Sequence, residues 1–255
     1  MLSKKVAKYI QSLSHKKLRD ELGAFVAEGP KVVSELLSHG IFSCKLICAN
    51  AKWLREAKSL TGIPAADIYE IEEEALKKIS LLKAPNAVVA VFQKKELINV
   101  PAPGNKITLL LDDISDPGNL GTIIRIADWF GIENIICSEN CVDCYNPKVV
   151  QSTMGSLGRV NIFYQELSLF ISANKNINSY AAALSGKPLS TFKNLQEGFI
   201  LIGNESKGVS EKLLEISTAQ ITIPKFGEAE SLNAAVAAGI ILSHIKSPLS
   251  PEGGT

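Results

Sequence analysis

The sequence has little of several features that would point to a particular class of protein. No apolar run among its 255 residues approaches the roughly 20 residues that a membrane-spanning helix requires. The lysines near the N-terminus are not followed by an apolar segment, so we expect no secretory signal. The net charge is only +1, and the three histidines are scattered without any Ser–His–Asp order. These absences argue against a membrane protein, a secreted protein and a hydrolase with a catalytic triad.

The cysteines argue against a disulfide framework and against a zinc site. There are five, an odd number without a disulfide framework, so we expect reduced thiols in the cytoplasm. Three of them follow a C-x3-C-x2-C pattern, at Cys137, Cys141 and Cys144. A zinc site needs four ligands, or three and a water, and no histidine lies nearby. We therefore expect no metal, and interpret these residues as small buried thiols.

Charge is distributed unevenly along the chain. Residues 1–58 contain eleven Lys or Arg and five Asp or Glu, a net charge of +6, and the other sixteen basic and twenty-one acidic residues leave −5. A basic N-terminal module beside a mildly acidic body fits a nucleic-acid-binding arm on a catalytic domain. Charge alone is equally compatible with an ordinary solvated surface.

The pattern of apolar residues predicts two α/β domains. Residues 1–92 form a small module, residues 93–106 carry two prolines and a glycine and are interpreted as a linker, residues 107–247 form the main domain, and residues 248–255 form a flexible tail. In the main domain we expect strands at 107–111, 134–138, 178–184, 199–203 and 219–223. The expected helices are 119–130, 146–157, 166–173, 210–217 and 231–245. This alternation predicts a mostly parallel sheet with helices on both faces.

Three segments of the main domain, 112–131, 202–210 and 223–239, share one design. In each, an apolar strand-like run leads into a loop rich in Gly, Asn, Ser or acid, and the loop leads into a helix. Ligand sites in open α/β sheets form at the carboxyl ends of the strands. Three such loops in one domain therefore predict one shared site.

Each loop contains candidates with two readings. Asn119 stands at a helix start, where its side chain could cap the helix or face a ligand. Arg125 leaves the apolar face of that helix and could reach the site or pair with Asp128. Glu205 could hold a substrate hydroxyl, or serve only the turn. Ser231 is a natural N-cap for a helix of small residues, which could pack against this chain or another subunit. Neither a Walker nor a dinucleotide-binding glycine pattern is present.

Taken in order, the three segments resemble the motifs of the SpoU (TrmH) branch of the SPOUT RNA 2′-O-methyltransferases. The first motif, NxGxxxR, is matched by Asn119-Leu120-Gly121 and Arg125. The second is the GNE loop at Gly203-Asn204-Glu205, and the third is IPM…SLN, matched by Ile223-Pro224 and Ser231-Leu232-Asn233. Each motif alone is weak, but three in order over about 130 residues are specific. The N-terminal module resembles the family's L30e-like substrate-binding domain through Arg19-Asp20-Glu21 and the run from Phe25 to Lys31.

The resemblance implies an α/β, parallel-sheet domain with a C-terminal trefoil knot, preceded by the small L30e-like domain. It implies S-adenosylmethionine held in the knot, and a homodimer packed through the knot. The implied backbone contacts to the cofactor are at Gly203, Ile223 and Leu232. The implied catalytic or RNA-site residues are Asn119, Arg125, Glu205, Ser231 and Asn233. Exposed cations of the arm would hold RNA phosphates, and the candidates are Lys16, Lys17 and Arg19.

The sequence departs from the family pattern at Lys225, where the third motif usually has Met. Because that loop mainly offers backbone groups, we expect cofactor binding to survive, and Lys225 could instead contact RNA.

The expected function is S-adenosylmethionine-dependent 2′-O-methylation of RNA, with large-subunit ribosomal RNA favoured. Transfer RNA is an alternative substrate, and a non-catalytic RNA-binding or ribosome-assembly factor on the same fold is an alternative function. Retention of Asn119, Arg125, Glu205 and Asn233 together favours the enzyme. Because guanidinium groups stay protonated in proteins, we expect Arg125 to stabilise the developing alkoxide rather than act as a base.

Overall fold

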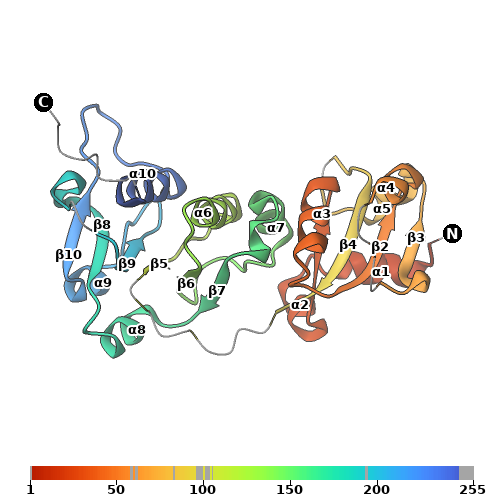
Figure 1. Cartoon of the computed structure of the whole chain (residues 1–255), viewed down its shortest axis with the longest axis horizontal. Helices are drawn as coiled ribbons and strands as arrows, with labels where there is room; N and C mark the ends of the chain where they lie inside the picture. Colours follow the sequence, from red (N-terminus) through yellow and green to blue (C-terminus); the bar gives the residue numbers. More distant parts are fainter. Residues whose placement is uncertain are drawn as a thin grey trace, which may run out of the picture. The chain divides into compact units, whose positions relative to one another are not determined.

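The computed structural model describes residues 2–57, 60, 63–82, 84–95, 100, 104, 106–192 and 195–246. The chain divides into two compact units, and each of them draws on two separate stretches of sequence (Figure 1). The first unit contains Met1–Glu96 and Asp143–Arg159, and the second contains Leu97–Val142 and Val160–Thr255. The expected tail at 248–255 and much of the expected linker at 93–106 lie outside the described residues.

The first unit is built on a four-stranded sheet in the order β1-β4-β2-β3. These strands are Ala24–Glu28 (β1), Val88–Gln93 (β4), Cys44–Ala49 (β2) and Ile68–Glu70 (β3). β4 is antiparallel to both of its neighbours, and β3 is parallel to β2. The helices are α1 (Lys4–Ser12), α2 (Lys16–Leu22), α3 (Pro30–His39), α4 (Ala51–Glu56) and α5 (Glu73–Ile79).

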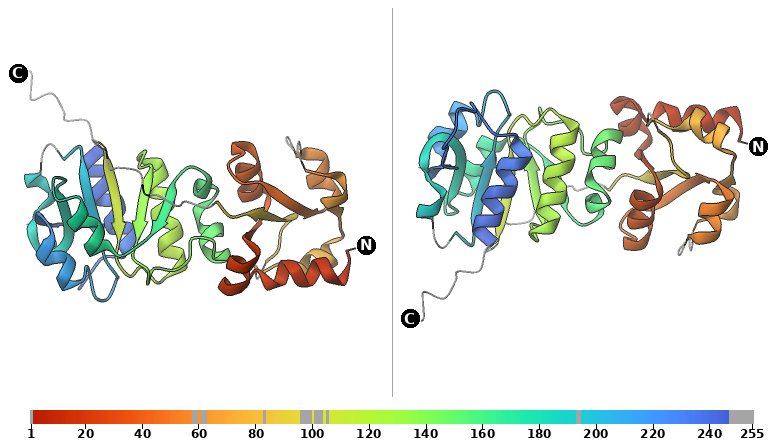
Figure 2. Two further views of the ribbon diagram at one scale, coloured as in Figure 1. Left: turned by 90° about the horizontal axis from the view of Figure 1, so that it is seen from below. Right: turned by 90° about the horizontal axis from the view of Figure 1, so that it is seen from above.

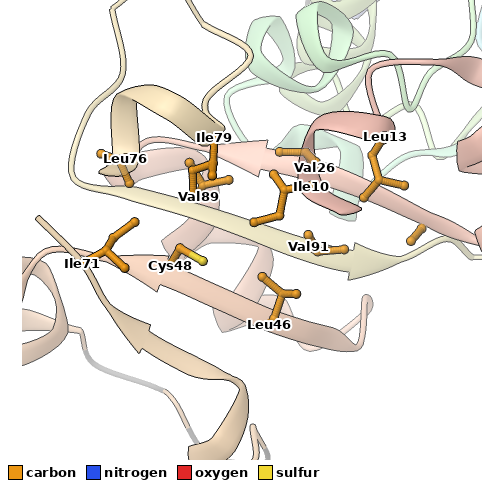
Figure 3. Packing of buried hydrophobic residues seen from close by; sticks show 11 residues of the cluster. Ile10, Leu13, Val26, Leu46, Cys48, Ile71, Leu76, Ile79, Val89 and Val91 are labelled. Atoms are coloured by element: carbon orange, nitrogen blue, oxygen red, sulfur yellow. The ribbon is translucent and has the colours of Figure 1, made fainter. Parts of the chain in front are cut away.

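The core of the first unit joins α1 and α5 to the sheet. Ile10 of α1 and Leu76 and Ile79 of α5 pack against strand residues such as Val89 and Val91 (Figure 3). All of these side chains are buried, so the hydrophobic effect holds α1 and α5 on the same face.

A segment between two strands of the second unit completes this first unit. Helix α7 (Pro147–Thr153) packs on β1 and α3, with Val149 and Val150 buried. Arg19, only 2% exposed, donates to Asp143 Oδ2 from Nη2 at 2.7 Å and from Nε at 3.0 Å. The packing unit therefore includes residues that follow the expected linker by some forty positions.

The second unit contains a six-stranded sheet in the order β10-β8-β9-β5-β6-β7, parallel throughout. The strands are Ile107–Leu111 (β5), Asn134–Cys137 (β6), Asn161–Tyr164 (β7), Ser179–Pro188 (β8), Gly198–Ile202 (β9) and Ala219–Thr222 (β10). Every residue of the central strands β5 and β9 is buried, as expected for a parallel sheet covered on both faces. The predicted α/β class and parallel sheet are thus confirmed. The trefoil knot stays a prediction, because strand order and pairing do not define how the chain threads.

Helices cover both faces of this sheet. Helices α6 (Pro117–Trp129) and α10 (Ala234–Lys246) pack side by side on one face (Figure 2). Helices α8 (Leu167–Ala173) and α9 (Glu211–Ile216) join the apolar cluster on the other face through residues such as Leu167 and Leu213. Within the described residues, no helix is both long enough and apolar enough to cross a membrane.

Several predicted elements and boundaries were wrong. Strand β7 was not predicted, since it is a four-residue strand at the sheet edge and takes its conformation from pairing with β6. The helix expected over 146–157 ends at Thr153, because Met154 and Gly155 both have positive φ. The helix expected from residue 231 begins only at Ala234.

Candidate functional site

The ends of two neighbouring strands bring the first two loops together. β5 and β9 are paired in register, with Leu111 opposite Ile202, so the segments that follow them start side by side. The loop after β9 is fastened to the end of β5, where Ser210 N donates to Asp112 Oδ2 at 2.8 Å. This confirms the expectation that these loops share one edge of the sheet.

A row of three side chains then links all three motifs. Asn119 Nδ2 donates to Glu205 Oε1, and Asn233 Nδ2 donates to Asn119 Oδ1 at 2.8 Å. The row therefore contains one residue from each loop, although 114 positions separate Asn119 and Asn233. It holds the Glu205 carboxylate in a defined orientation at the strand ends.

The helix caps differ from those expected. Asp116 caps α6 by accepting from Asn119 N at 2.8 Å, which leaves the Asn119 side chain to form the row. Asn233, rather than Ser231, caps α10, and its Oδ1 accepts from Ala235 N at 2.9 Å. Ser231 Oγ instead donates to the Glu205 carbonyl at 3.5 Å. The prediction of Ser231 as N-cap was wrong, because α10 begins three residues later than expected.

Asn204 shapes the second loop, although its side chain was given no role from the sequence. Its Oδ1 accepts from Ser206 N at 2.9 Å and from Lys207 N at 3.2 Å. Its Nδ2 donates to the carbonyl of Asp113 at 2.9 Å, and Asp113 has a φ of 56°. An asparagine that bonds to the backbone two residues on is a known turn signal, so the sequence did contain a hint.

A pocket of about 540 Å³ opens beside the row. The three expected cofactor positions, Gly203, Ile223 and Leu232, all line this pocket. Glu205 and Ser231 line it as well. Its volume lies within the range of about 300–1,000 Å³ that is typical of ligand sites. Gly203 is required there, because an added Cβ would overlap the backbone of Gly208 and Val209. The glycine thus lets the loop fold back tightly on residues 208–209 at the edge of the pocket.

Arg125 stands apart from these groups. It is exposed on α6, and it forms no hydrogen bond or ion pair, with Asp128 or any other residue, in the part of the chain that the structure describes. It does not line the pocket and does not join the row of Asn119, Glu205 and Asn233. Its guanidinium group is therefore available to a ligand.

The expected RNA-binding cations divide into two kinds. Lys16 and Lys17 are exposed on α2, and Lys17 lies 3.8 Å from Glu21 at the surface. Arg19 is buried and also donates to the carbonyls of Leu13 and Ser14, each at 2.9 Å. The expectation that Arg19 holds RNA phosphates was wrong, since its guanidinium group is already used inside the fold.

The cysteines serve packing and local hydrogen bonding. All five are free. Cys141 Sγ accepts from Ile114 N and donates to the Leu111 carbonyl, each at 3.2 Å. A hydrogen bond with Cys137 contributes most to lowering the pKa of Cys141. No group of three or more potential metal ligands occurs among the residues that the structure describes.

Sequence comparisons identify two regions of the chain. The SpoU rRNA Methylase family matches residues 106–243, and the MRM3-like substrate binding domain matches residues 4–90. The 23S rRNA (guanosine(2553)-2'-O)-methyltransferase RlmP of Bacillus subtilis is 31% identical over 240 residues, which cover 92% of this chain and 94% of that protein. The 23S rRNA (uridine(2479)-2'-O)-methyltransferase of Streptomyces viridochromogenes is 28% identical over 251 residues, which cover 90% and 85%.

A solved structure resembles the whole chain. It is the AdoMet-bound rRNA methyltransferase from Sinorhizobium meliloti, which is 30% identical with a TM-score of 0.82. The match covers 96% of this chain and 95% of that one. The resemblance thus extends over both units.

Proposed function

The chain belongs to the SpoU rRNA methylase family, and on this basis we propose that it transfers a methyl group from S-adenosylmethionine to a ribose 2′-oxygen of ribosomal RNA. The observation that carries the proposal is the row of Asn233, Asn119 and Glu205 beside the pocket. A binding factor without catalysis would have no need to orient a carboxylate from three separate loops.

The pocket suits the cofactor. Backbone groups at Gly203, Ile223 and Leu232 would hold S-adenosylmethionine, which supplies an electrophilic methyl group on its sulfonium. The departure at Lys225 leaves these backbone groups in place, so we propose that cofactor binding is retained.

Glu205 orients the ribose. Its Oε1 is held by Asn119, whereas its Oε2 has no partner among the residues that the structure describes. Oε2 can therefore accept a hydrogen bond from the ribose hydroxyl and direct an oxygen lone pair toward the methyl group. Alignment of this kind supplies a large part of the acceleration in a transfer between two bound groups. The Arg125 cation stabilises the negative charge that develops on the oxygen, and the hydroxyl proton passes to an RNA phosphate or to water as the methyl group leaves the sulfonium.

Arg125 points to a site shared between two copies of the chain. On α6, Arg125 and Trp129 are four positions apart and share a face, and Trp129 is 84% exposed. Val236 and Ile240 on the adjacent α10 are also exposed, at 49% and 40%. Exposed apolar patches of this kind mark interaction surfaces. We propose a homodimer packed through α6 and α10, in which Arg125 of one subunit serves the pocket of the other.

The substrate is proposed to be large-subunit ribosomal RNA. Both methyltransferase relatives described above act on 23S rRNA, one on a guanosine and the other on a uridine. Membership of the family therefore indicates ribose chemistry without specifying the base. Lys16 and Lys17 in the matched substrate-binding domain would contact phosphates, which position RNA without reading its sequence. All five cysteines are described and none forms a disulfide bond, which fits a reducing compartment, and we propose the cytoplasm.

Mapping ribose methylation in total RNA tests this function directly. RNA from cells with and without the gene would be compared, and the strain without it would be complemented with the wild type or with Glu205→Gln. We expect one ribosomal position to lose its methyl group and to regain it only with the wild type. Loss of a transfer-RNA methyl group, or an unchanged map, would contradict the proposal.

A further inference from the structure

The connection between β10 and α10 carries an aromatic side chain with almost no contact to the rest of the protein. Residues 224–233 are exposed throughout and form neither helix nor strand. Phe226 within them is 98% exposed. Its ring faces are therefore accessible to a molecule that binds at this connection.

The ring stands at the site. Phe226 and the neighbouring Lys225 belong to the rim of the pocket that also contains Glu205. Ser231 in the same connection reaches the Glu205 carbonyl at 3.5 Å. A ring folded down over the pocket would be partly covered by the other rim residues. The 98% exposure means that it stands clear of them and is open to solvent beside the pocket.

We infer that Phe226 stacks on the base of the nucleotide whose ribose is methylated. The inference rests on the proposed function. A 2′-oxygen can reach Glu205 only when its nucleotide lies at the pocket mouth, and an unpaired base then exposes its ring face. Aromatic side chains are the usual partners of such bases, and stacking accepts any base. Lys225 places a positive charge beside the ring, where a phosphate of the same nucleotide can bind.

Three full-length variants test this role, with a ribosomal RNA fragment that carries the mapped position as substrate. Stacking of one base contributes about 1–3 kcal/mol, so Phe226→Ala should raise KM for RNA or lower kcat/KM by about 5- to 150-fold. Phe226→Trp should retain most of the wild-type kcat/KM, because it keeps an aromatic face. Phe226→Leu should not, because it keeps only apolar bulk. The affinity for S-adenosylmethionine, measured by calorimetry, and the sedimentation behaviour should match the wild type in all three.

Each other result would overturn the inference in a distinguishable way. Equal activity of Phe226→Leu and wild type would show that apolar contact suffices without stacking. Weaker cofactor binding by Phe226→Ala would make the ring a cover for the cofactor, and altered sedimentation would make it part of an interface between copies. If the wild type is active and Phe226→Ala is equally active in a parallel assay, the stacking inference is wrong but the proposed function stands. A wild type that methylates no ribosomal RNA would remove the proposed function as well.

Discussion

The neighbourhood of Arg19 in the first unit and that of Arg125 in the second use the same side chain in opposite ways. Arg19 is buried, and its guanidinium group donates to a carboxylate and to two backbone carbonyls. Arg125 is exposed and has no partner among the described residues. A guanidinium group with four hydrogen bonds made inside the fold contributes to stability. One without such bonds on a functional surface is free to bind a ligand.

The largest expected effect comes from removing the buried arginine. Arg19→Ala leaves the nearly buried Asp143 carboxylate without its partner, and breaking a buried ion pair costs about 3–5 kcal/mol. We expect that loss in the free energy of unfolding measured with urea. Lys16→Ala, an exposed neighbour on the same helix, is the matched control and should change little. Unchanged stability together with weaker, less salt-dependent RNA binding would contradict this and show that Arg19 binds RNA phosphates.

The second largest effect is on activity rather than on stability. Arg125→Ala should lower kcat by about 10²–10³-fold, which is typical of removing one group that stabilises charge in a transition state. Stability should remain within about 0.5 kcal/mol of wild type, since surface side chains without partners contribute little. The affinity for S-adenosylmethionine should also be retained. Calorimetry that showed lost cofactor binding with unchanged turnover would contradict the assigned role.

Subunit mixing sharpens this second prediction. Arg125→Ala and Glu205→Gln should each be inactive alone, but a mixed dimer contains one complete site if Arg125 acts in its partner's pocket. An equal mixture should then recover about a quarter of wild-type activity, because about half of the dimers are mixed and each has one such site. No recovery would place Arg125 and Glu205 of the same subunit in one site. A monomer in sedimentation experiments would remove the shared site altogether.

A smaller effect is expected from the exposed cations near Arg19. Replacing both Lys16 and Lys17 with Ala should reduce the slope of log K against log salt by about 1.4–1.8, from about 0.7–0.9 per phosphate contact. RNA binding should weaken while the methylated position stays the same, because phosphate contacts position RNA rather than specify it. A salt titration of RNA affinity measures this. An unchanged slope would mean that α2 presents only a solvated face.

The smallest effect concerns a buried acid of the first unit. Burial raises the pKa of Glu28 above its usual range, against the opposing hydrogen bonds from Ser80 and Leu81 N. The folded state therefore binds this proton more tightly than the unfolded state. The resulting stability is fully present below the unfolded pKa and is lost as the pH rises through the folded pKa. Glu28→Gln should flatten the decline in the free energy of unfolding over that window, and an unchanged pH profile would contradict this.

The sequence predicted the central strands of the sheet better than its edge strand and the contacts between its loops. The short apolar runs of β5 and β9 were recognisable because every residue in them is buried. The four-residue strand β7 was not, since its conformation depends on the neighbouring strand. At the site, the motif residues Asn119 and Glu205 were identified, but the hydrogen bond that joins them was not.

Burial was the quantity that local sequence could not supply. Arg19 follows two exposed lysines and looked equally exposed, because its partner Asp143 lies 124 positions further along the chain. Likewise, Ser231 and Asn233 are both good N-cap residues. Only the bonds from Ala235 N and Val236 N to Asn233 Oδ1 show which one starts the helix.

The position of α7 has a consequence for the order of events during synthesis. The first unit needs the buried Val149 and Val150 of α7 and the Asp143 carboxylate, yet the ribosome makes these residues after β5, α6 and β6 of the second unit. Domains usually fold as they emerge, with the N-terminal one first. Here the first unit cannot complete its packing until about residue 159 has left the exit tunnel. By then β5, α6 and β6 of the second unit have already been synthesised, so the two units fold over overlapping periods.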